Sequence, residues 1–176
     1  MQNGVITLIY IISQVLGICG FIVSLIAFHR KEKKTILKTS ILSNILDLIH
    51  YILLGAYSGA ITKVLAMLRN YFVILKERHP KLSNIFYLIM FIILYLLASV
   101  ITYDGILSVL PLLAALIYVI VLWNGNEQQV RIAAFFGYFL WLTYNIFVLS
   151  IAGIISDVVS IISVFIAISN NRHKKD

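Results

Sequence analysis

Charged and amide side chains interrupt the hydrophobic runs of this sequence, and they are its best candidates for chemistry. Asp47 and His50 lie in the second apolar run, and Arg69 and Asn70 lie in the third. If these runs cross a membrane, each charge costs about 2.5–3.5 kcal/mol on insertion scales. We therefore expect Asp47 and Arg69 to lie at similar depth in neighbouring antiparallel helices and to pair, directly or through one polar group or water.

Such a pair has two interpretations. It can be a structural ion pair that joins two helices, or it can be the polar centre at which a substrate or a proton binds. His50 titrates near physiological pH when unperturbed, but its position toward a helix end also fits contact with interfacial water. Lys63 and Asp157 are expected as charges near helix ends, either solvated or bridging two helix bundles.

The sixth apolar run carries Trp141, Tyr144 and Asn145 on one helical face. Aromatic rings at depth can stack against a sugar or another ring-bearing solute, although core packing is their commoner use. The predicted solute-binding residues are therefore Asp47, His50, Arg69, Asn70, Trp141 and Asn145.

Enzymatic patterns are missing from the sequence. It has no Ser-His-Asp arrangement, no glycine loop with lysine for phosphate, and no Cys/His spacing for a metal. We expect no enzyme, cofactor or metal site. The net charge of +7 comes from basic residues in short segments between apolar runs, which is a topology signal and not a nucleic-acid surface.

The elements that must position these residues are membrane helices. The chain has 176 residues, of which 61% are hydrophobic and 12% are charged. A spanning helix needs about 20 mostly apolar residues, so this length predicts an all-α integral membrane protein with seven transmembrane helices. The apolar runs are Val5–Phe28, Ile36–Gly55, Ile61–Leu75, Ile85–Ile101, Ile106–Trp123, Ile132–Leu149 and Ile154–Ile168.

Basic residues predict the orientation of these helices. The loops near Tyr57–Gly59, Tyr103–Gly105 and Ser150–Gly153 contain no lysine or arginine. The alternate loops and adjoining helix ends contain twelve of the fourteen lysines and arginines, which places the N-terminus outside and the C-terminus in the cytoplasm. The basic residues are Arg30, Lys31, Lys33, Lys34, Lys38, Lys76, Arg78, Lys81, Arg131, Arg172, Lys174 and Lys175.

An internal repeat is also predicted. A shift of 94 residues lays the first three helices over the last three without a gap, so that Gly59 meets Gly153 and Arg78 meets Arg172. We expect a first three-helix bundle over 5–78, a linker helix over 84–103 and a second bundle over 105–172. The linker makes the two bundles parallel, in a 3+1+3 arrangement.

Several short motifs are spread from the second apolar run to the turn before the seventh. They are His50 with Leu53-Leu54-Gly55-Ala56-Tyr57, Leu68-Arg69, Leu110-Pro111, Trp141 with Tyr144-Asn145, and Ser150-Ile151-Ala152-Gly153. In these motifs, the chain as a whole resembles the YgjV-like bacterial inner-membrane proteins. This resemblance implies a multi-pass protein of the bacterial inner membrane, with no defined activity.

The 3+1+3 layout is similar to that of the SWEET and PQ-loop transporters, with Pro111 in the first helix of a triplet. The sequence departs from them because it has no Pro-Gln pair, and Gly17 stands where the second triplet has Pro111. This similarity implies a small-solute transporter that works by alternating access between two bundles. The alternative is a membrane scaffold or receptor that does not transport. The expected partners are the lipid bilayer and a small polar solute, and the sequence leaves a homo-oligomer open.

Overall fold

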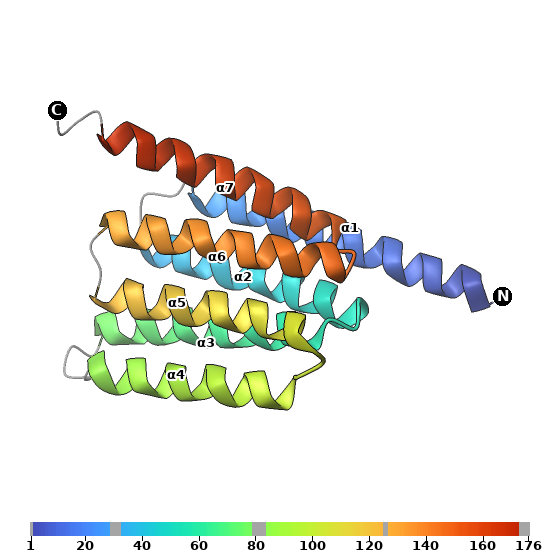
Figure 1. Cartoon of the computed structure of the whole chain (residues 1–176), viewed down its shortest axis with the longest axis horizontal. Coiled ribbons are helices and arrows are strands. Elements are labelled where there is room, and N and C mark those ends of the chain that lie inside the picture. Colours follow the sequence, from blue (N-terminus) through green and yellow to red (C-terminus); the bar gives the residue numbers. More distant parts are fainter. Residues whose placement is uncertain (1, 29–32, 79–83, 125–126, 173–176) are drawn as a thin grey trace. The chain divides into compact units, whose positions relative to one another are not determined.

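The computed structural model describes residues 2–28, 33–78, 84–124 and 127–172, and these form helices without any strand (Figure 1). The expected all-α membrane fold is confirmed, and each of the seven apolar runs falls mainly in one helix, although the run 106–123 is divided between η1 and α5. The helices are α1 (Gln2–Phe28), α2 (Lys33–Leu53), α3 (Tyr57–Arg78), α4 (Asn84–Ile101), the 3-10 helix η1 (Ile106–Val109), α5 (Leu110–Asn124), α6 (Glu127–Phe147) and α7 (Ile151–Arg172).

Four segments are long and apolar enough to cross a membrane: Gly4–Ala27, Thr35–Leu53, Tyr57–Leu75 and Gln128–Phe147. Three further apolar helical segments are shorter. The helices expose many large apolar side chains, such as Val15 and Ile18 on α1. That surface suits hydrocarbon, where a helix satisfies its own backbone hydrogen bonds. The shorter segments are Ile85–Ile101, Ile106–Val121 and Ile151–Ile166.

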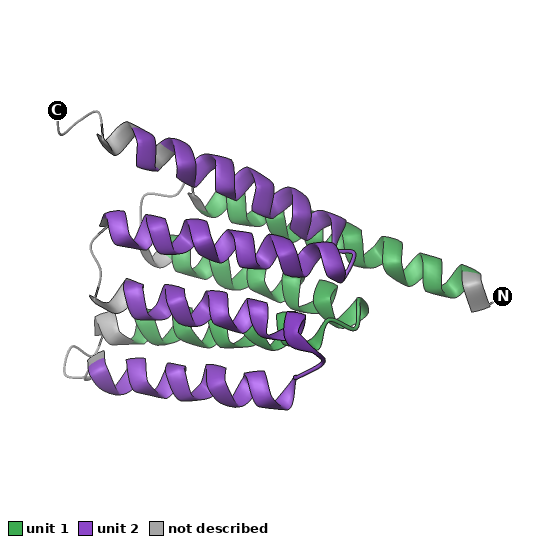
Figure 2. Ribbon diagram, in the orientation of Figure 1, with its two compact units in different colours: residues 1–83 green, residues 84–176 purple. Residues whose placement is uncertain are grey.

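The chain divides into two compact units, residues 1–83 and 84–176 (Figure 2). In the first unit, α2 packs against both α1 and α3. In the second unit, α6 packs against both α5 and α7, and α4 packs against α5. Helix α4, the expected linker, thus clusters with the second unit. The 3+1+3 arrangement stays a prediction.

The turn between α2 and α3 has a defined helix-ending geometry. Gly55 has a φ of 71°, in the left-handed region that glycine adopts without strain. The Ala56 N–H donates to the Tyr51 carbonyl at 2.9 Å, and the Gly55 N–H donates to the Ile52 carbonyl at 3.0 Å. This pair of bonds is a Schellman motif, which satisfies the last carbonyls of α2 and reverses the chain directly into α3.

The turn between α6 and α7 has the same geometry. Leu149, with a φ of 54°, takes the left-handed position although it is not glycine. The Ser150 N–H donates to the Asn145 carbonyl at 2.9 Å, and the Leu149 N–H donates to the Ile146 carbonyl at 3.4 Å. Each of these residues lies 94 positions after its counterpart in the first turn. Helices α2 and α6 are both 21 residues long, and α3 and α7 are both 22 residues long.

Several basic residues behind the predicted orientation lie outside the described residues. The orientation of the termini therefore stays a prediction. These residues are Arg30, Lys31, Lys81, Lys174 and Lys175.

Candidate functional site

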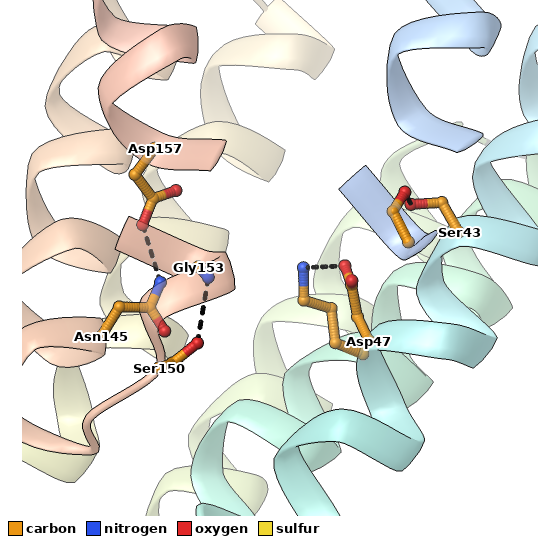
Figure 3. A network of polar contacts seen from close by, with 8 residues as sticks. Ser43, Asp47, Asn145, Ser150, Gly153 and Asp157 are labelled. Atoms are coloured by element: carbon orange, nitrogen blue, oxygen red, sulfur yellow. Dashed lines mark hydrogen bonds and ion pairs between the residues drawn. The ribbon is translucent and has the colours of Figure 1, made fainter. Parts of the chain in front are cut away.

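An ion pair joins α2 and α3 inside the first unit. Lys63 Nζ lies 2.7 Å from Asp47 Oδ2 (Figure 3). This is a short hydrogen bond between two charged groups, which is stronger than one between neutral groups. The two side chains keep 20% and 19% of their surface exposed, respectively. Asp47 lies six residues before the end of α2, and Lys63 lies six residues after the start of α3. At a rise of about 1.5 Å per residue, both therefore lie about 9 Å from the turn that joins these helices.

The expected direct pairing of Asp47 with Arg69 is wrong, because the ion-pair partner of Asp47 is Lys63. Arg69 lies six residues beyond Lys63 in α3, which places it about 9 Å farther from the turn. Antiparallel helices joined by a short turn bring together residues at equal distances from that turn, and this rule selects Lys63. Arg69 Nη2 donates instead to Oδ1 of its neighbour Asn70 at 3.4 Å. Asn70 is buried and Arg69 is half-buried.

Helix α1 packs directly against the Asp47 carboxylate at Gly20. A β-carbon on Gly20 would collide with Asp47 Oδ1 and would lie 3.4 Å from the Cγ of the same residue. Beside it, the Ser43 hydroxyl donates to the Gly20 carbonyl at 2.8 Å. The Lys63 ammonium also lies 5.8 Å from the centre of the Tyr51 ring, within the range of a cation–π contact. The charges are thus held by three helices of one unit.

His50 is buried in this cluster, with 1% of its surface exposed. Its Nδ1 lies 2.6 Å from the Ser13 carbonyl oxygen of α1. Because a carbonyl oxygen only accepts hydrogen bonds, Nδ1 must carry a proton and donate it. The interpretation of His50 as a residue in contact with interfacial water is therefore wrong, and its position is that of a bond between α1 and α2.

The second unit has a polar pair close to its α6–α7 turn. Asn145 Nδ2 donates to Asp157 Oδ2 at 2.7 Å, which joins α6 to α7 (Figure 3). These side chains are sealed, with 1% and 7% of their surfaces exposed. Gly153 makes the space, because a β-carbon there would lie 2.5–2.6 Å from three atoms of the Asn145 amide. The Ser150 hydroxyl accepts the Gly153 N–H at 3.1 Å and so caps the start of α7.

Trp141 lies one turn before Asn145 and is half-buried. Its ring packs edge-on against Tyr144, with a centroid distance of 6.0 Å and an interplanar angle of 83°. Tyr144 is buried, so on this face of α6 its side chain is part of the packed core. The tryptophan ring keeps a partly exposed surface on which a solute could stack.

The expectation for Lys63 and Asp157, that these charges near helix ends are solvated or bridge two bundles, is wrong. Lys63 pairs with Asp47 and Asp157 pairs with Asn145, each within its own unit, and Asp157 is buried. The sequence does hold a signal, because Asp47 lies eight residues before Gly55 of the turn and Lys63 lies eight residues after it. Counting from the turn, and not from the centre of the apolar run, would have paired Lys63 with Asp47.

Comparison with known proteins gives one family. The model of the Imp-YgjV family, described as a bacterial inner membrane protein, matches residues 11–175. Neither a curated protein nor a solved structure matches the chain.

Proposed function

Since the chain belongs to the Imp-YgjV family of bacterial inner membrane proteins, we propose that it carries a small polar solute across that membrane. The observation that carries this proposal is the partly exposed ion pair of Asp47 and Lys63. Helix α2, with 21 residues, is about 31 Å long, close to the hydrocarbon thickness of about 30 Å. A pair about 9 Å from the end of this helix lies at hydrocarbon depth.

Exposure is the important property of this pair. A charge that faces lipid tails is expensive, so a pair that serves architecture alone is best sealed by its neighbours. One fifth of each side chain is open. We expect that open surface to face water or a polar solute, which is what a transport pathway offers at this depth.

The two units supply a second line of support. Four backbone hydrogen bonds of the α2–α3 turn have counterparts 94 residues later in the α6–α7 turn. The close approach of Ser43 to Gly20 has its counterpart in Gly137, where a β-carbon would lie 3.9 Å from Ala114. We propose that the units contain copies of one three-helix bundle, in parallel orientation, and that alternating access uses the movement of one copy against the other.

A scaffold or receptor is the second candidate. It is favoured by the sealed contact of Asn145 with Asp157, which joins two helices and leaves almost no surface for a solute. If every polar contact in the protein were sealed in this way, no polar surface would remain for a solute to bind.

Uptake of radiolabelled solutes into proteoliposomes tests the proposal. The panel contains sugars, neutral amino acids and small organic acids, measured with the purified protein and with protein-free vesicles. We expect uptake of at least one class, and we expect Asp47→Asn to abolish or uncouple it. The matched control is Thr143→Val, because the Thr143 hydroxyl is exposed and bonds only within its own helix, to Phe139. Uptake of no solute above protein-free vesicles would favour the scaffold.

A further inference from the structure

We infer that the ion pair of Asp47 and Lys63 binds a zwitterionic solute, whose cationic group faces Asp47 and whose carboxylate faces Lys63. This inference rests on the proposed transport function and adds the chemical class of the solute. It is carried by the 2.7 Å contact between the two charges and by their partial exposure.

Charge balance selects the class of solute. The pair is neutral as a unit, so a cation or an anion that entered alone would leave one charge uncompensated in a medium where that is costly. A zwitterion brings both signs and keeps the total at zero. It can therefore exchange one internal ion pair for two pairs with the solute, while an uncharged sugar offers only dipoles.

Bonding capacity makes this exchange feasible. A carboxylate has about four lone-pair sites, and a lysine ammonium has three N–H donors. Asp47 uses Oδ2 for Lys63, and its other oxygen lies against Gly20. The nearby Tyr51 ring offers its negative face to a positive group, as it does to the Lys63 ammonium at 5.8 Å. A cationic group beside Asp47 thus enters surroundings that already accommodate positive charge.

The polar pair of the second unit is an example of a polar contact that is closed to solutes. Asn145 and Asp157 lie below an equivalent turn, yet they are sealed, and Gly153 closes on the amide. The first unit has full charges and open surface at this place, while the second has an amide, one acid and almost no open surface. Solute recognition is therefore assigned to the ion pair of the first unit.

Isothermal titration of the full-length protein in lipid nanodiscs tests the inference on the wild type. Glycine betaine and L-proline are the zwitterionic probes. Choline has the cation alone, propionate has the anion alone, and glucose has neither. We expect at least one zwitterion to bind ten times or more tightly than each of the other three. Equal or tighter binding of choline, propionate or glucose overturns the inference, as does the absence of binding by both zwitterions.

The double variant Asp47→Asn/Lys63→Gln separates recognition from folding. It removes both charges together, so neither is left unpaired, and two amides can still hydrogen-bond between α2 and α3. We expect it to elute as wild type in size exclusion and to bind the zwitterion at least tenfold more weakly. Unchanged binding overturns the inference. Thr143→Val again serves as the control that keeps wild-type affinity.

The two proposals can fail separately. Proteoliposome uptake of glucose or propionate without uptake or binding of a zwitterion would retain transport and overturn the zwitterion site. Zwitterion binding that depends on Asp47, without uptake of any solute, would retain the site and favour a receptor over a transporter.

Discussion

The side-chain amide of Asn145 occupies the space that a β-carbon on Gly153 would need, with its Cγ 2.5 Å from that position. The amide is at the same time fixed by its bond to Asp157. A larger residue at this glycine must therefore displace a buried polar group that has a partner to lose.

We predict that Gly153→Ala destabilises the protein by about 1–3 kcal/mol, the usual range for overpacking. The matched control is Gly137→Ala, because a β-carbon there meets Ala114 at 3.9 Å, which is an ordinary contact. In a helix interior alanine is favoured over glycine by about 0.5–1 kcal/mol, so this control is expected to be neutral or stabilising. Thermal unfolding in detergent measures both. Equal melting temperatures of the two variants would contradict the close approach.

The ion pair predicts an unusual order of stabilities. Asp47→Asn leaves the Lys63 ammonium without its carboxylate, and breaking a buried pair costs about 3–5 kcal/mol, less here because one fifth of each side chain is exposed. Asp47→Asn/Lys63→Gln leaves no such charge, so we expect the double variant to be more stable than the single one. The melting temperatures of the two variants decide. A double variant that is less stable than Asp47→Asn would show that Lys63 has another compensating partner.

His50 is expected to act through its Nδ1–H and not through its charge. An asparagine amide nitrogen can take the place of Nδ1, so His50→Asn should retain most of the stability that the bond to Ser13 provides. His50→Leu removes the donor, and we expect it to lose about 1 kcal/mol relative to His50→Asn. Urea or thermal unfolding of both variants gives the comparison. A leucine variant as stable as the asparagine variant would mean that the hydrogen bond contributes nothing.

Chemical labelling can test whether the ion pair is open to water. In a Cys19→Ser background, which removes the single native cysteine, we expect Lys63→Cys to react with a charged, membrane-impermeant methanethiosulfonate. Asp157→Cys is the matched position in the second unit, and its burial predicts a rate at least tenfold lower. Similar rates at both positions would remove the difference in exposure on which the choice of site depends.

The orientation of the chain is testable without any assumption about function. Reporter fusions at Tyr57, Tyr103 and Ser150 are expected to report the outside of the membrane, because the loops near these residues have no lysine or arginine. A fusion after Arg172 is expected to report the cytoplasm. A cytoplasmic signal at any of the three outer positions would contradict the seven-span topology.

The sequence predicts the helices of this protein better than its contacts. Apolar runs locate helices well because hydrocarbon requires every backbone group to be bonded within the helix. The apolar pattern predicts the start of α3 four residues late, at Ile61 and not at Tyr57, because polarity at Ser58 and Gly59 hides a helix that begins directly after the turn.

Side-chain partners were harder to predict because they depend on register. Arg69 looked central in the third apolar run, but the short turn at Gly55 aligns Lys63 with Asp47. The bond from His50 to Ser13 joins residues 37 apart and depends on how α1 leans on α2, which no local pattern records. Leu149 in the left-handed region is similarly invisible, since leucine gives no turn signal.

The ion pair also bears on how the chain enters the bilayer. Helix α3 contains the least apolar of the four long spanning segments and carries both Lys63 and Arg69. Inserted alone, it would bring these cations into hydrocarbon without a counter-charge, whereas α2 already contains Asp47 at the matching distance from the tight turn. It follows that biogenesis favours α2 and α3 entering together as a hairpin, with the salt bridge formed during insertion. The same contact that we assign to solute recognition thus helps the protein to be made.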